Sequence, residues 1–189
     1  MRHAIDGAAA RAMRKSQEEA PTLVDVLDER AEMLESRGVL FNTAILEQTD
    51  IVIYAPDELE FSPELSTLKS FARSLRITHD KSFAESAMTA SSAKHRILIF
   101  ANVTDAYDAV DWLMRVRKLD PELAIIVTST EFSSNDLTTA RAGICDASLR
   151  QPYTTVNLAL GVTAALNNNR EIRMRSLEDH LDAGIVAAE

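Results

Sequence analysis

The chain has 189 residues, 46% of them hydrophobic and 26% charged, which is typical of one folded soluble domain with appendages. Its 29 acidic residues outnumber the 20 Lys and Arg, and no local basic stripe offsets the net charge of −9, so we expect no direct binding to nucleic acid. One cysteine excludes an internal disulfide, and no run of about 18 apolar residues predicts a membrane span, so the sequence favours a cytoplasmic protein without membrane insertion.

Residues 1–49 predict a helical N-terminal extension. Pro21 suits the first turn of a helix, and Gly38 suits the position just past its end. Between them, apolar residues recur at 3-4-3 spacing and form one narrow stripe: Val24, Leu27, Ala31 and Leu34. Such a stripe has to cover an apolar surface, which is either the core of the same chain or a second copy or partner.

Residues 50–166 alternate short apolar runs with amphipathic segments. The apolar runs predict buried strands at 51–54, 77–79, 96–100, 123–127 and 147–149. The amphipathic segments predict helices at 63–75, 81–93, 105–119 and 135–142, and a fifth helix after Pro152. Five strands interleaved with five helices predict a doubly wound, flavodoxin-like α/β domain with a five-stranded parallel sheet.

Residues 167–189 predict a helical C-terminal extension. The segment begins with three asparagines, which are poor helix formers, and a helical pattern resumes after them with Met174, Leu177 and Leu181 at 3-4 spacing. We therefore expect the last helix of the domain to continue through a soft joint at the asparagines.

The order of elements from residue 96 to 166 is distinctive. An apolar strand and a loop precede a helix ending in RVRKLDPEL, a strand reading AIIVTS, a helix ending in ARAG and a strand ending in QPY. In order and spacing, this stretch resembles the second half of the receiver domain of bacterial response regulators. The resemblance implies the receiver fold, and it allows the residues of the phosphorylation site to be compared one by one.

In that family, an acidic pair holds magnesium, an aspartate accepts the phosphoryl group, and a hydroxyl and a lysine bind its oxygens. The resemblance places Pro56, followed by Asp57, where the acidic pair is expected. It places Asn102 at the phosphoacceptor, Thr128 at the hydroxyl and Gln151 at the lysine. An amide is a far weaker nucleophile than a carboxylate, and Gln151 carries no charge. The resemblance therefore implies a degenerate pocket without bound metal or cofactor and without catalysis.

The leading interpretation is a phosphorylation-independent pseudo-receiver that acts as a protein interaction or dimerisation module in bacterial signalling. A protein partner is expected, such as a regulator, a kinase or an effector, and so is a homodimer. In the family, the fourth helix, fifth strand and fifth helix form the contact face, here 134–143, 147–149 and 155–166. Together with the terminal stripes, the expected contact residues are Val24, Leu27, Ala31, Leu34, Leu158, Leu177 and Leu181.

Three alternatives remain. The chain is the sensory part of a larger effector, such as an RNA-binding antiterminator of the ANTAR type. It is a small-molecule sensor that uses the vacated pocket. The last alternative, an enzyme on a flavodoxin-like scaffold, is disfavoured because the expected site offers amides and a hydroxyl but no strong acid, base or nucleophile.

Overall fold

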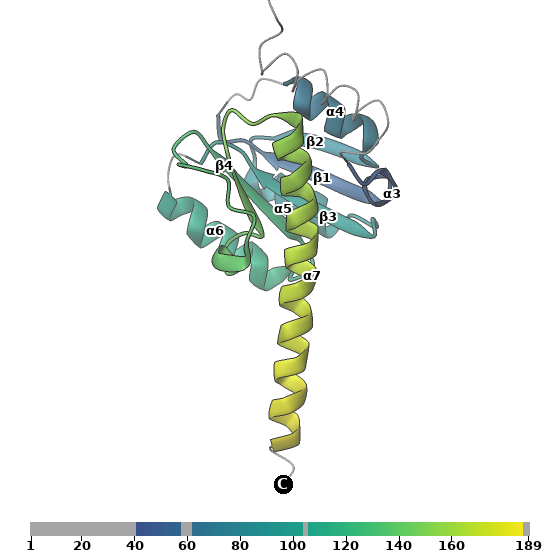
Figure 1. Ribbon diagram of the computed structural model, residues 1–189, viewed down its shortest axis with the longest axis vertical. Helices are drawn as coiled ribbons and strands as arrows, with labels where there is room; N and C mark the ends of the chain where they lie inside the picture. The colour runs from purple at the N-terminus through teal and green to yellow at the C-terminus, as the bar shows by residue number, and fades with distance from the viewer. Residues whose placement is uncertain (1–40, 58–61, 104–105, 187–189) are drawn as a thin grey trace, which may run out of the picture.

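The computed structural model describes residues 41–57, 62–103 and 106–186. Five parallel strands form one sheet in the order β2-β1-β3-β4-β5, which confirms the flavodoxin-like doubly wound fold (Figure 1). The strands are β1 (Thr49–Tyr54), β2 (Ser74–Thr78), β3 (His95–Phe100), β4 (Ala124–Ser129) and β5 (Ala147–Arg150).

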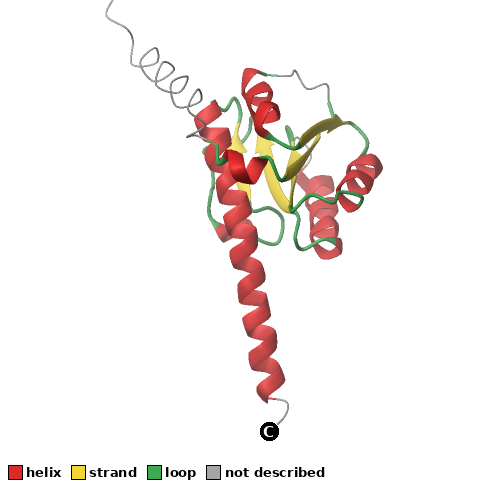
Figure 2. Cartoon of the chain, turned by 90° about the vertical axis from the view of Figure 1, so that its right-hand side faces the viewer, coloured by secondary structure: helices red, strands yellow, loops and turns green. Residues whose placement is uncertain are grey.

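Helices cover both faces of the sheet (Figure 2). They are α3 (Thr43–Leu46), α4 (Pro63–Phe71), α5 (Lys81–Thr89), α6 (Ala106–Leu119) and α7 (Thr155–Val186), with a short 3₁₀ turn at Thr139–Arg141. Local signals explain where two of them begin. Ser62 caps α4 ahead of Pro63, and the Asp80 carboxylate accepts a hydrogen bond of 2.8 Å from the Ser82 amide at the start of α5.

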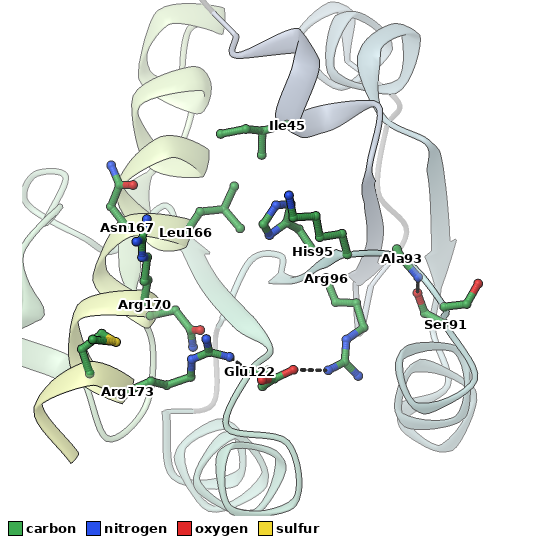
Figure 3. A pocket seen from close by; sticks show the side chains of 14 residues that line it. Ile45, Ser91, Ala93, His95, Arg96, Glu122, Leu166, Asn167, Arg170 and Arg173 are labelled. Carbon is green, nitrogen blue, oxygen red and sulfur yellow. Dashed lines mark hydrogen bonds and ion pairs between the residues drawn. The ribbon is translucent and has the colours of Figure 1, made fainter. Parts of the chain in front are cut away.

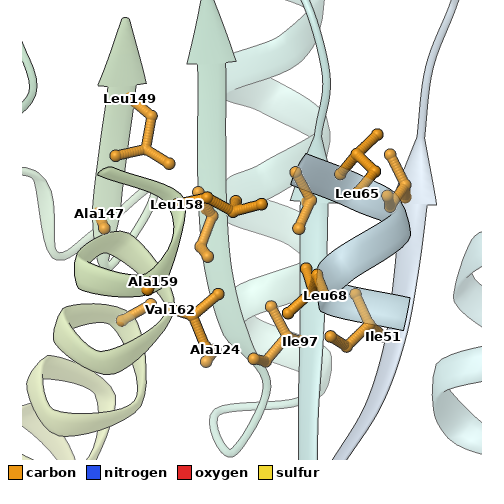
Figure 4. Close-up of a cluster of buried hydrophobic side chains, with 14 of the residues drawn as sticks. Ile51, Leu65, Leu68, Ile97, Ala124, Ala147, Leu149, Leu158, Ala159 and Val162 are labelled. Carbon is orange, nitrogen blue, oxygen red and sulfur yellow. The ribbon is translucent and has the colours of Figure 1, made fainter. Parts of the chain in front are cut away.

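The strands β1, β3 and β4 are buried on both faces, and their alternate residues belong to different cores. In β1, Ile51 and Ile53 pack with α4 and α7, as Figure 4 shows for Ile51, whereas Val52 and Tyr54 pack with α5 and α6. This two-sided burial explains why the strands are near-continuous apolar runs in the sequence.

The helix expected at 135–142 is absent, and that prediction was wrong. Only Thr139–Arg141 forms a 3₁₀ turn. Short polar side chains bind the local backbone instead, because Asp136 Oδ1 accepts hydrogen bonds from the amide and the hydroxyl of Thr138, at 3.0 and 2.7 Å. Asp136 also pairs with Ser148 of β5 in an isolated antiparallel bridge. The segment 134–143 is therefore a loop that covers the edge of β5, not a helical contact face.

The soft joint expected at the asparagines is also absent. The 32-residue helix α7 runs without a break through positions 167–169 and projects well past the sheet (Figure 1). The asparagines hold the helix to the domain. Asn168 Nδ2 donates to the carbonyls of Leu137 and Asp146, and Asn169 Nδ2 donates to those of Pro121 and Leu123, at distances of 2.7–3.2 Å.

The expected contact residues differ in how exposed they are. Leu158 is fully buried between α7 and the sheet (Figure 4), so its assignment to an interaction surface was wrong. At this point the helix lies so close to β5 that a Cβ on Gly161 would come within 2.8 Å of Leu149 Cδ1. Leu177 is 60% exposed and stays available for contacts. Val24, Leu27, Ala31 and Leu34 lie outside the described residues. Leu181 lies in α7, at a position whose side chain the structure does not describe.

Among the helices of the described residues, none combines the length and apolar character that crossing a membrane requires.

Candidate functional site

Three of the five residues expected in the degenerate pocket meet at the carboxyl edge of the sheet. Asn102 follows β3, Thr128 lies in β4 and Gln151 follows β5, so the parallel strands bring them to the same edge. The Asn102 amide donates to Thr128 Oγ1 at 3.2 Å, and Gln151 Nε2 donates to the same oxygen at 2.9 Å. We call Asn102, Thr128 and Gln151 the carboxyl-edge network.

Thr128 is the centre of this network. Its side chain is fully buried, and its hydroxyl oxygen accepts two hydrogen bonds from the chain, which is the number that its two lone pairs allow. The hydroxyl is therefore committed to holding the loops after β3 and β5 together, and a ligand would have to displace one of these bonds to reach the oxygen.

Further hydrogen bonds hold the loop after β3 against β4. The Val103 amide donates to the Thr128 carbonyl at 2.9 Å, and Ser129 Oγ donates to the Val103 carbonyl at 2.9 Å. Asn102 itself has a φ of 54°, in the left-handed region that asparagine tolerates better than most residues other than glycine. The loop after β3 is therefore fixed against β4 by both main-chain and side-chain bonds.

One polar atom in the network lacks a partner. Asn102 Oδ1 is buried and accepts no hydrogen bond from any described residue. A buried amide oxygen without a donor costs about 1–3 kcal/mol, so this atom is the point in the network where a water or a donor group would bind.

Pro56 and Asp57 stand apart from the network. Both are exposed at the end of β1, and no hydrogen bond in the described part of the chain joins Asp57 to Asn102, Thr128 or Gln151. Magnesium requires several oxygen ligands, usually including carboxylates. The described residues contain no group of three His, Cys, Asp or Glu side chains that would hold a metal ion, so the site does not fit the magnesium of a receiver domain.

A cavity of about 350 Å³ adjoins the network. Gln151 forms part of its wall, and so does Tyr153, whose pKa is raised to about 12 by burial and by the nearby charge of Glu64. The cavity walls are formed by Ser62, Glu64, Leu65, Thr130, Gln151, Pro152 and Tyr153. At neutral pH the Tyr153 phenol is protonated. The cavity therefore offers neutral hydrogen-bonding groups and one carboxyl group, that of Glu64.

The sequence analysis did not predict a larger groove at the amino ends of the strands, at the other end of the sheet from the carboxyl-edge network (Figure 3). Its basic residues come from two short clusters, Lys94–Arg96 at the start of β3 and Arg170–Arg173 in α7, which are more than 70 positions apart. Neither cluster forms a basic stripe by itself, so only the fold reveals that they face one another.

No family model matches the sequence, and neither does any curated protein. Among solved structures, the chain is similar to a NifS-like protein from Rickettsia africae ESF-5, at 10% sequence identity and a TM-score of 0.38. The match covers 81% of this chain and 56% of the other, so the chain spans little more than half of that protein's length. A likeness this weak carries no argument about function, which has to be inferred from the chain's own residues.

Proposed function

We propose that this chain is a receiver-like module that works without phosphorylation and acts through contacts with proteins, including a second copy of itself. The observation that carries the proposal is the carboxyl-edge network, in which the backbone amide of Asn102 and the neutral side-chain amide of Gln151 donate to the buried hydroxyl oxygen of Thr128. Receiver chemistry needs a carboxylate and a cation at these positions, and the chain supplies Asn102 and Gln151 instead.

The network also favours a single, fixed conformation. The Thr128 oxygen accepts bonds from the Asn102 backbone amide and from Gln151 Nε2, and these bonds hold the loops after β3 and β5 in one arrangement over the buried side chain. Such a module is regulated by what binds to it rather than by covalent modification. Its output therefore depends on surfaces outside the degenerate pocket.

The projecting half of α7 supplies such a surface. Met174 is 51% exposed and Leu177 is 60% exposed, and their spacing matches positions a and d of a heptad. Two exposed apolar side chains at this spacing support pairing between two copies of the chain.

A phosphorylation assay tests the chemical half of the proposal. The full chain is incubated with acetyl phosphate and magnesium and analysed by intact mass spectrometry, beside an Asn102→Asp chain that restores the carboxylate. We expect the wild-type chain to gain no phosphoryl group. A phosphoryl adduct on an aspartate of the wild-type domain would refute phosphorylation independence.

A further inference from the structure

The groove at the amino ends of the strands is large enough to hold a small molecule. Its volume is about 760 Å³, within the range of about 300–1,000 Å³ typical of small-molecule sites. The loop before β3 forms one wall, α7 forms the opposite wall, and Ile45 of α3 closes one end (Figure 3). The carboxyl-edge network lies at the other end of the strands, so the two regions are separate.

The charge of the groove is opposite to that of the chain. Four basic side chains line it, Lys94 and Arg96 on one wall and Arg170 and Arg173 on the other, whereas the whole chain carries a net charge of −9. Glu122 is the one acidic side chain among the described residues of its lining. A recessed cluster of one sign focuses the field and raises the local concentration of small anions.

Glu122 shows what the groove can hold. Its carboxylate lies between arginines from the two walls, with Oε1 2.7 Å from Arg173 Nη1 and Oε2 3.8 Å from Arg96 Nη2 (Figure 3). The Glu122 side chain is 67% exposed, so it is not fixed there by burial. Arg96 is itself paired with Asp120, at 2.6 Å between Nη1 and Oδ2, so Arg173 is the arginine that binds the Glu122 carboxylate directly and Arg96 lies beside it.

Further binding capacity remains around this carboxylate. Arg173 Nε is buried and has no hydrogen-bond partner in the described part of the chain. Lys94 and Arg170 form no ion pair with any carboxylate of the described residues. Their charges are therefore not neutralised within the groove, and they lie on opposite walls. A second oxyanion group would satisfy them.

Apolar side chains complete the groove. Ile45, Leu166 and Met174 lie beside the basic residues and offer a surface for the body of an organic molecule. A long polyanion such as RNA is disfavoured, because the acidic surface of the remaining chain would repel every segment outside the groove. These features together favour a small ligand with several charged groups.

We propose that this groove binds a small organic oxyanion with at least two phosphate or carboxylate groups. Arg173 holds one group in the place that Glu122 occupies, and Lys94 and Arg170, from opposite walls, hold the other. This site goes beyond the proposed interaction function and does not depend on it.

Calorimetric titration of the full chain at low salt tests the site with three probes: inorganic pyrophosphate, ADP and citrate. Binding of pyrophosphate and ADP points to a phosphate ligand, and binding of citrate points to a carboxylate ligand. We expect Arg173→Gln and Lys94→Gln to weaken binding at least about tenfold, since each removes one charge-assisted contact. Lys94 lies away from α7, so its variant tests the groove independently of helix pairing.

Two further variants complete the test. Arg175→Gln changes an arginine of the same helix that pairs with Glu171 outside the groove, and we expect it to leave the affinity unchanged. Glu122→Gln removes the competing carboxylate and should tighten binding severalfold, a gain that misfolding would not produce. The proposal is overturned if no probe binds at millimolar concentration, if Arg173→Gln and Arg175→Gln behave alike, or if RNA homopolymer binds while all three probes fail.

Discussion

At the scale of single residues, Thr128 links the two loops that a receiver domain would use for chemistry. The order of elements along the chain was enough to place Asn102, Thr128 and Gln151 at one edge of the sheet, because parallel strands end together. The hydrogen bonds among them were not predictable, since they depend on the loop geometry at Asn102 and Gln151. Pro56 and Asp57 were expected in the same pocket, although the proline turn itself indicates that Asp57 points elsewhere, and both are exposed beside the pocket.

Removing the Thr128 hydroxyl should destabilise the domain. Thr128→Val leaves the Asn102 amide and Gln151 Nε2 without their acceptor, which we expect to cost about 1–3 kcal/mol of unfolding free energy. Urea denaturation measures the loss. Thr130→Val is the matched control, because Thr130 is exposed, and its variant should stay within about 0.5 kcal/mol of the wild type. Equal stabilities of the two variants would show that the network does not hold the loops.

His95, in the wall of the groove, should make stability depend on pH. Burial and the charge of Lys94 lower its pKa below the usual 6.5. The folded state therefore prefers the neutral ring, and the contribution of His95 is fully present above pH 6.5 and is lost as the pH falls toward the lowered pKa.

Denaturation at about pH 7.5 and about pH 5.5 checks this dependence. We expect the wild type to lose more stability between the two values than His95→Gln, which cannot gain the proton. The same loss in both proteins would assign the pH dependence to other groups.

At the scale of elements, the strands were the most predictable part, because runs such as 96–100 are apolar on both faces and are buried on both. The connection between β4 and β5 was not predictable from the sequence. Ser134 suggests the start of a helix, but the side chains of Asp136 and Thr138 form local hydrogen bonds that hold the segment as a loop. The soft joint predicted at the asparagines of α7 was wrong for a similar reason. Low helix propensity suggested a joint, but the carbonyls that bind Asn168 and Asn169 come from distant loops that the sequence does not place.

The three consecutive asparagines provide a controlled test of how α7 is anchored. Asn169 is buried and donates to the carbonyls of Pro121 and Leu123, so Asn169→Ala should cost about 1–3 kcal/mol of unfolding free energy. Asn167 is exposed, and Asn167→Ala should be neutral or stabilise by about 0.5 kcal/mol through better helix propensity. Equal effects on the urea midpoint would mean that the buried bonds do not anchor the helix.

At the scale of the whole molecule, the fold separates three regions. The carboxyl edge of the sheet is closed by neutral side chains, the amino edge carries the basic groove, and α7 extends past the domain with Met174 and Leu177 exposed (Figure 1). We propose that such a module acts through the groove and through α7 and not through a phosphorylated aspartate. Pairing along α7 is therefore the property that most directly distinguishes an interaction module from an isolated domain.

The decisive measurement is the solution mass of the full chain by light scattering, compared with Leu177→Glu and with a control, Phe83→Glu. Phe83 is 46% exposed on α5, which packs on the other face of the sheet from α7. We expect the wild type and the control to have twice the chain mass of 20.9 kDa, and Leu177→Glu to have the single chain mass, because a charge at the helix interface opposes pairing. A wild type of 20.9 kDa, or a Leu177→Glu chain that still pairs, would contradict the account.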